Sequence, residues 1–190
     1  MKLSLQGVAI GLAIIGTLGT SQATLIDFTG INFSGASFTI GDVTFKDSIG
    51  SGLVTGAYSE SNYSNALAVF SDDLSRLQLS FSRYYEYLSF EFGNDQPGYG
   101  SPNGKMHLDL YRDGQSVANY SLTANWDDRM NQSLSGTGLF NYAEIYYDTR
   151  LIEVIDNIEY RMNINHTPEP ATMFLVGIGI VGLAAIRRKK

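Results

Sequence analysis

The sequence predicts an all-β protein, an antiparallel β-sandwich of the jelly-roll kind, with a short apolar segment at each end of the chain. Two observations predict the sandwich. Apolar and polar residues alternate with a period of two in several runs, which places one set of side chains on a core and the other in water. Turn-forming residues separate these runs at short intervals. Residues 24–166 are numerous enough to form one domain with its own core.

The chain begins with a predicted secretory signal peptide, residues 1–23. A positively charged start precedes an apolar stretch at residues 8–18, and the small residues Ser21 and Ala23 occupy the positions that signal peptidase reads. Cleavage after Ala23 would leave Thr24 as the mature N-terminus. The alternative is an uncleaved membrane helix, which is less favoured because the apolar stretch is short for a span.

Within the body, alternation marks several runs as strands. The clearest of these runs are residues 77–82, 87–92, 106–111 and 157–164. The Asp113-Gly114 dipeptide predicts a tight hairpin between two strands, and the glycine-rich residues 135–138 predict a turn. Residues 151–155 are apolar on both faces, which favours a buried strand over a short helix. These elements together predict a sandwich of many short strands.

The chain ends in three consecutive elements. They are a rigid Pro168, Glu169 and Pro170; an uncharged apolar run at residues 171–186; and the basic cluster of Arg187, Arg188, Lys189 and Lys190. As a helix, the apolar run would be about 24 Å long, at ~1.5 Å per residue, against ~30 Å for the hydrocarbon core of a membrane. We therefore predict a marginal transmembrane helix with the body outside and the basic cluster inside. The alternative is a buried C-terminal helix or strand.

In their order and spacing, these three elements resemble the PEP-CTERM sorting signal of exported bacterial proteins. The resemblance covers residues 167–190. It implies that an exosortase-type membrane protease recognises the tail, cuts near the Pro-Glu-Pro motif and passes the body to the cell surface or the extracellular matrix. The inner membrane would then hold the precursor only transiently. The resemblance also implies an association with exopolysaccharide and biofilm. The segments "LSFEFGND" (88–95) and "LDLYRDGQ" (108–115) resemble jelly-roll domains found with this tail.

The composition of the body argues against several classes of function. Residues 24–166 contain 18 Asp and Glu against 8 Lys and Arg, a net charge of −10, which disfavours nucleic-acid binding. The chain has no cysteine, and His107 and His166 are its only histidines. Neither histidine belongs to a nucleophile or metal motif. We therefore predict a protein that is not an enzyme; a secreted hydrolase with paired carboxylates is the disfavoured alternative.

The tyrosines of the body suggest a carbohydrate-binding surface. A tyrosine on a polar strand face combines a flat apolar ring with a hydroxyl group, as sugar-binding surfaces do. The candidate residues for carbohydrate are Tyr85, Tyr87, Tyr111 and Trp126. We expect four side chains of one strand to face solvent: Tyr85, Tyr87, Ser89 and Glu91. The reason is that Leu88 and Phe90 must face the core. The alternative is that tyrosine only covers an exposed sheet.

A structural calcium ion is the one cofactor that the sequence suggests. Asp27, Asp156 and Asn157 offer oxygen ligands of the kind that calcium prefers. They would meet because the first and last strands of a jelly roll often lie close together. The alternative is that these residues cap turns. For the body as a whole, the sequence leaves open a structural matrix protein and a carbohydrate-binding module.

Overall fold

The computed structural model describes residues 22–50, 52–56, 65–69, 74–94, 104–125, 129–148 and 153–162. All regular structure within these ranges is β-strand, and every strand pairing is antiparallel. The strands are β1 (Gln22–Ile26), β2 (Ser34–Gly35), β3 (Ser37–Ile40), β4 (Val43–Asp47), β5 (Leu53–Gly56), β6 (Ala66–Val69), β7 (Leu77–Asn94), β8 (Lys105–Arg112), β9 (Gln115–Thr123), β10 (Gln132–Tyr147) and β11 (Glu153–Met162).

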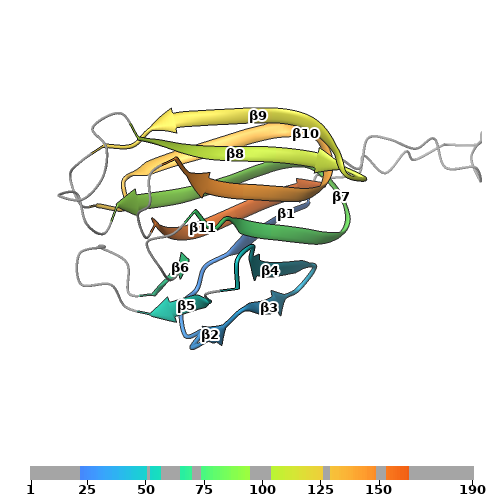
Figure 1. Ribbon diagram of the computed structural model, residues 1–190. Coiled ribbons are helices and arrows are strands. Elements are labelled where there is room, and N and C mark those ends of the chain that lie inside the picture. Colours follow the sequence, from blue (N-terminus) through green and yellow to red (C-terminus); the bar gives the residue numbers. More distant parts are fainter. Residues whose placement is uncertain are drawn as a thin grey trace, which may run out of the picture.

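Hydrogen bonds join these strands into one continuous sheet that folds over on itself as a sandwich. What we call the first layer has the order β3-β4-β7-β10-β8-β9. The second layer has the order β2-β5-β6-β11-β7-β10, with β1 also paired to β11. Figure 1 shows the stack of strands from β2 at the bottom to β9 at the top. The predicted antiparallel β-sandwich is confirmed.

Strands β7 and β10 belong to both layers because each is long enough to turn a corner. Residues 77–81 of β7 pair with β4, whereas the part of β7 from Tyr87 onward pairs with β11. The buried side chains of β7 are odd-numbered at Leu77, Leu79, Phe81 and Tyr85, and they are even-numbered from Leu88 onward. β10 changes phase in the same way after Phe140. Such a one-residue shift is the signature of a β-bulge, which bends a strand.

The core between the layers consists mainly of one large cluster of apolar side chains drawn from both of them. Within the described ranges, Ala66, Met130 and Val154 form a second, small cluster. The bulkiest fully buried side chains include Phe28, Phe45, Phe90, Phe92 and Phe140. At the corner, the ring of Phe81 meets those of Phe140 and Tyr160 edge to face, with centroid distances of 5.3 and 5.5 Å. Edge-to-face contact is a preferred arrangement of aromatic rings, so this cluster stabilises the bend of β7 and β10.

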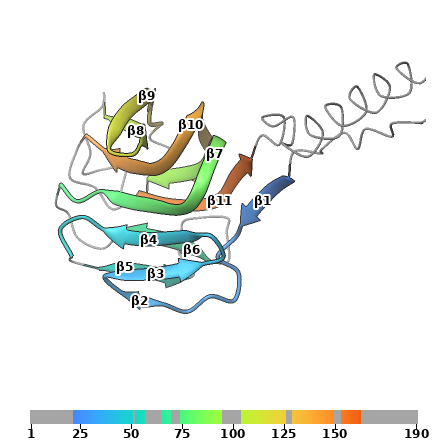
Figure 2. The same cartoon turned by 90° about the vertical axis from the view of Figure 1, so that its right-hand side faces the viewer.

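Strands β1 and β11 lie side by side at an edge of the second layer. Gln22 stands opposite Met162, and Ile26 stands opposite Ile158. The start of β1 and the end of β11 therefore occupy the same corner of the molecule (Figure 2). The predicted cleavage after Ala23 falls within β1, and it would leave the pairs from Thr24 onward in place. The expectation that the first and last strands meet is confirmed.

The sequence predicts the hairpin correctly but not the glycine-rich turn. Asp113 and Gly114 join β8 to β9 with φ angles of 50° and 80°, as a tight hairpin of two residues requires. Residues 135–138 lie instead inside β10. A Cβ atom on Gly136 would stand 2.7 Å from the ring of Tyr120. Gly136 is therefore needed for close packing and not for a turn.

Two further expectations concern membrane segments. Within the ranges that the structure describes, no helix is long and apolar enough to cross a membrane. Residues 1–21 of the predicted signal peptide and the predicted transmembrane helix at residues 171–186 lie outside those ranges. Both segments stay predictions. The strand prediction for residues 151–155 is confirmed for its described part, where β11 begins at Glu153.

Candidate functional site

The outer face of the second layer carries a groove with a volume of about 440 Å³. This volume lies within the range of small-molecule sites, which begins at about 300 Å³. The groove is lined by Leu25, Tyr87, Ser89, Phe90, Glu91, Ser133, Ser135, Asn157 and Glu159. These residues come from four adjacent strands, β1, β11, β7 and β10. We call this feature the serine groove.

The floor of the serine groove is a row of side chains across the sheet. Ser89 of β7 stands opposite Ser135 of β10 on one side and Glu159 of β11 on the other. Leu25 of β1 continues the row beyond Glu159. Directly opposed residues lie about 5 Å apart, and serine is short, so the sheet is hollowed at the centre. Each serine hydroxyl can both donate and accept a hydrogen bond.

Tyr87 forms one wall of the groove, and its neighbours hold it in place. The guanidinium carbon of Arg161 lies 4.3 Å from the centroid of the Tyr87 ring. Arg161 Nε in turn donates a hydrogen bond of 2.7 Å to Glu159 Oε1. The cation is thus fixed between a carboxylate and an aromatic face. The ring is already positioned before a ligand arrives, which lowers the entropic cost of binding.

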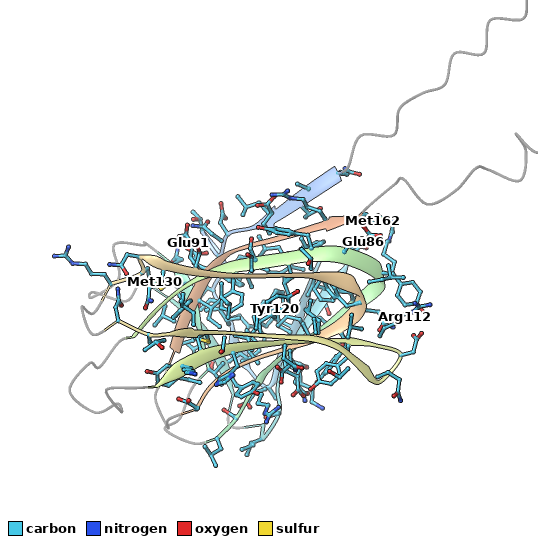
Figure 3. The ribbon with its side chains drawn as sticks, turned by 90° about the horizontal axis from the view of Figure 1, so that it is seen from above. Glu86, Glu91, Arg112, Tyr120, Met130 and Met162 are labelled. Atoms are coloured by element: carbon cyan, nitrogen blue, oxygen red, sulfur yellow. The ribbon has the colours of Figure 1, made fainter. Side chains whose placement is uncertain are left out.

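Glu91 and Asn157 form the opposite side of the groove. Asp156 pairs with Glu91 and Glu159 pairs with Ser89, so β11 uses one residue more than β7 over this stretch. At this bulge Asn157 adopts a φ of 50°, which asparagine tolerates better than most residues. Its Nδ2 donates to Glu91 Oε2 at 3.0 Å. In Figure 3, Glu91 lies toward one end of the molecule and Met162 toward the other.

The structure brings together the residues suggested for calcium. Asp156 is 4% exposed, and its Oδ1 accepts hydrogen bonds from the backbone N–H groups of Asn157 at 2.8 Å and Phe28 at 3.4 Å. Burial raises the pKa of Asp156 despite these bonds, and the charges of Asp27 and Glu91 add to the shift. No group of three or more acidic or histidine side chains in the described ranges could hold a metal ion. Calcium stays a prediction from the sequence.

Tyr85 is a core residue, so the expectation that it faces solvent is wrong. It is 3% exposed, and its ring packs against those of Tyr160 and Phe81 at centroid distances of 4.8 and 5.2 Å. Its hydroxyl reaches the rim of the sandwich and donates to Asp42 Oδ2 at 2.8 Å. Burial and the bond to Asp42 raise the pKa of Tyr85.

The physical reason is the bulge that follows Tyr85. The next two residues, Glu86 and Tyr87, are both partly exposed, and burial resumes at Leu88. Strict alternation along β7 would place Tyr85 and Tyr87 on one face, but the bulge separates them. Tyr87, Ser89 and Glu91 do face away from the core, as the sequence predicts.

A second cluster of polar and aromatic side chains covers the outer face of the first layer. Tyr111 lies here, with its ring 5.5 Å from that of Tyr142. His107 stacks on Tyr146 at 4.7 Å, and the guanidinium carbon of Arg76 lies 4.0 Å from the centroid of the Tyr146 ring. Tyr111 and His107 share the outer face of β8, and both are partly buried. Tyr111 is thus on a different layer from Tyr87 and outside the serine groove.

Within this second cluster, hydrogen bonds connect the side chains to one another. The Tyr146 hydroxyl donates to Asp109 Oδ2 at 3.0 Å, and Asn119 Nδ2 donates to Asp109 Oδ1 at 2.8 Å. Asp109 is only 7% exposed. Such satisfied networks stabilise and order a sheet. We therefore assign this face to stability.

Glu144 is the acidic centre of this network. It accepts hydrogen bonds from Arg76 Nη1 at 2.6 Å, the Tyr142 hydroxyl at 2.8 Å and Gln78 Nε2 at 3.2 Å. Burial alone would raise the pKa of Glu144, but these partners outweigh it and hold the pKa below its usual 4.5. A carboxylate whose pKa is lower in the folded than in the unfolded state stabilises the folded protein. This contribution to the free energy of unfolding is fully present above the unfolded-state pKa, and it is lost as the pH falls through the folded-state pKa.

We therefore expect Glu144→Gln to be less stable than the wild type at neutral pH, with a difference that shrinks as the pH falls below 4.5. Thermal unfolding followed by circular dichroism from pH 7 to about pH 3 measures this difference. A difference that stayed constant over this range would show that the ionisation of Glu144 contributes nothing to stability.

Several predicted site residues fall outside the described ranges. They are Trp126 and the sorting residues Pro168, Glu169, Pro170, Arg187, Arg188, Lys189 and Lys190. Conversely, the sequence did not indicate Ser133 or Ser135 as part of a site. The signal that could have indicated them is the alternation of Ser133, Leu134 and Ser135, which is typical of a strand. The glycines that follow this stretch favoured a turn instead.

Comparison with known proteins adds an assignment for the end of the chain. Residues 166–189 match the model of the PEP-CTERM protein-sorting motif. The C-terminal segment is a PEP-CTERM sorting motif. This result confirms the resemblance drawn from the Pro-Glu-Pro element, the apolar run and the basic cluster, and it marks the protein as an exported one. No curated protein matches the chain.

Solved structures with a similar course of the chain are all-β domains of low sequence identity. The K2 adhesin domain of Lys-gingipain is 11% identical, with a TM-score of 0.49, and the match covers 74% of this chain and 100% of that one. The C-terminal CBM6 of LamC from Zobellia galactanivorans is 13% identical over 75% and 100% of the two chains, with a TM-score of 0.34. A β-1,3-glucan-binding CBM6 from Bacillus halodurans is 10% identical over 74% and 96%, with a TM-score of 0.36. At these scores, any argument about function rests on the serine groove itself.

Proposed function

We propose that the protein is an exported, non-enzymatic module that binds a polysaccharide in the serine groove. The observation that carries the proposal is the composition of the groove, in which a hydroxyl floor lies beside the fixed ring of Tyr87 and the amide and carboxylate of Asn157 and Glu91. A sugar ring needs this combination, because it presents apolar C–H faces together with hydroxyl groups that donate and accept.

The sorting motif supports a location for this function. In our proposal, an exosortase-type protease releases the body from a transient inner-membrane anchor to the cell surface or the extracellular matrix. The polysaccharide would then be the exopolysaccharide that surrounds the producing cell. A single groove with one aromatic wall binds weakly, so retention in a biofilm would depend on many copies acting on one polymer.

Hydrolysis of the polymer is the second candidate function, since Glu91 and Glu159 both line the groove. Glycosidases use two carboxyl groups, one of which must donate a proton. Glu159 already accepts a 2.7 Å hydrogen bond from Arg161 Nε, so one of these two carboxylates is engaged within the protein. Release of reducing sugar by the wild type, lost in Glu91→Gln, would nevertheless establish an enzyme.

Two changes in the groove test binding directly. We expect Tyr87→Ala to weaken the affinity for the producer's own exopolysaccharide about tenfold, since one stacking contact is worth roughly 1.4 kcal/mol. Ser89→Trp should abolish binding, because the indole would fill the floor. Affinity of the full chain in mild detergent can be measured by isothermal titration calorimetry.

The matched control is Tyr84→Ala, which removes an exposed tyrosine of the same strand that hydrogen-bonds Asp113 and lies outside the groove. It should bind as the wild type does. If Tyr87→Ala and Ser89→Trp were both retained on the polymer as well as the wild type, the groove would not be the binding site. A structural matrix protein would then be the better description.

A further inference from the structure

The floor of the serine groove runs across the strands and not along them. It is the row formed by Ser135, Ser89, Glu159 and Leu25, one residue from each of β10, β7, β11 and β1. Neighbouring strands lie about 4.8 Å apart, so the three intervals of this row make the floor roughly 14 Å long. The floor is therefore longer than a single sugar ring.

A ridge of side chains borders the floor on each side. On one ridge, Arg161 of β11 lies over the ring of Tyr87 of β7. On the other ridge, Asn157 of β11 donates a hydrogen bond of 3.0 Å to Glu91 of β7. Each ridge is thus held across two strands by its own contact. A ligand that lies between the two ridges is directed across the sheet, from β10 toward β1.

Both ends of the floor lie at an edge of the sheet. Among the described strands, β1 pairs only with β11, and residues 132–137 of β10 pair only with β7. The side chains at the two ends, Leu25 and Ser135, are both exposed, Leu25 to 59%. No strand in the described ranges therefore closes the floor at either end. A polymer chain can enter the groove at one edge of the sheet and leave it at the other.

Recognition of a chain end needs a groove of a different shape. A terminal sugar differs from an internal one on the side where the chain stops, so a site selects it by placing side chains across that side. The serine groove has its ridges along the floor instead, and no described strand crosses its ends. Its shape suits a polymer that continues in both directions.

We infer that the serine groove binds an internal segment of a polysaccharide chain, laid across β10, β7, β11 and β1. This inference rests on the proposed polysaccharide binding and specifies which part of the polymer is recognised. At the β1 end, the polymer covers the exposed side chain of Leu25, which removes apolar area from water. Because internal segments outnumber chain ends, many copies of the protein can occupy one polymer and retain one another on it.

Stoichiometry separates internal from terminal binding. The full chain in mild detergent is titrated with a size-selected, long fraction of the producer's own exopolysaccharide, whose chain ends are counted by methylation analysis. Isothermal titration calorimetry gives the number of protein copies bound at saturation. We expect more bound copies than chain ends. A ratio of one copy or fewer per chain end would overturn the inference.

Two variants act at opposite ends of the floor. Ser135→Trp fills its β10 end with an indole, and Leu25→Ala removes the apolar side chain at its β1 end. Both positions are exposed, so the fold should tolerate the changes. We expect each variant to weaken binding about fivefold or more, because a polymer that crosses the sheet contacts both positions. Leu139→Trp and Leu139→Ala are the matched controls, at an exposed position of β10 outside the groove lining, and should bind as the wild type does.

The two proposals can fail separately. Unless Ser135→Trp and Leu25→Ala both weaken binding, the polymer does not reach both edges of the sheet, and the inference is overturned. Polysaccharide binding in the groove would still stand in that case, provided that Tyr87→Ala and Ser89→Trp weaken it. If those two variants bind the exopolysaccharide as the wild type does, both proposals fall.

Discussion

Tyr85→Ala is expected to lower the free energy of unfolding by about 3 to 5 kcal/mol, the range for buried aromatic rings cut to alanine. The ring is enclosed by Tyr160 and Phe81 at the corner where β7 passes between the layers. A domain of this size is stabilised by only about 5 to 15 kcal/mol in total. The variant should therefore be close to unfolding at growth temperature, which urea unfolding followed by circular dichroism would show.

Two further variants serve as comparisons for Tyr85→Ala: one tests its hydroxyl group, and the other tests a tyrosine on the outer face. Tyr85→Phe keeps the ring and loses only the 2.8 Å hydrogen bond to Asp42, so it should cost about 1 kcal/mol. Tyr87→Ala, two residues away but on the outer face, should cost less than about 1 kcal/mol. Equal losses for Tyr85→Ala and Tyr87→Ala would contradict the change of phase in β7.

Replacing Pro168, Glu169 and Pro170 by alanines is expected to block release of the protein almost completely. Proline disfavours a helix at its own position and at the residue before it, so we expect the wild-type motif to be presented to a protease as an extended strand. Alanines permit a continuous helix. The altered protein should still be inserted, and it should accumulate uncut in the inner membrane, as cell fractionation and mass analysis of its C-terminus would show.

Glu169→Ala alone, with both prolines kept, separates stiffness from side-chain recognition. If the single variant is released and the triple variant is not, extended backbone is what the protease needs. Delivery of the triple variant to the surface at the wild-type level would mean that the tail is an anchor and not a processing signal.

The sequence predicts those parts of the fold that depend on neighbouring residues. Alternation predicts that Leu88, Phe90 and Phe92 lie in the core, as the structure shows. Successive side chains of a strand point to opposite faces, and only one of the two possible orientations buries these three. The Asp113-Gly114 hairpin was predictable because few residues other than glycine, asparagine and aspartate accept a positive φ. Local chemistry was sufficient in both cases.

The serine groove could not be predicted in full because its parts meet only through long-range pairing. Ser89 was assigned to the outer face, yet a hollow forms there only because Ser135, 46 positions further along the chain, stands opposite it. The error at Tyr85 has a related cause. The alternation of apolar and polar residues does not reveal where a bulge lies. Alternation continued through Glu86, without the one-residue shift that the bulge introduces, places Tyr85 on the outer face.

The position of β11 has a mechanical consequence. This strand contributes Asn157 and Glu159 to the groove, and the chain continues from its end at Met162 toward the sorting motif. If the body at the cell surface is held through the chain beyond Met162, drag on a bound polymer would pull β11 along its own axis. Its hydrogen bonds to β1 and β7 run across that direction, so they would be sheared together and not peeled one by one. We therefore expect a domain held in this way to resist such a pull better than its equilibrium stability alone would suggest, because forced unfolding is governed by the barrier to unfolding.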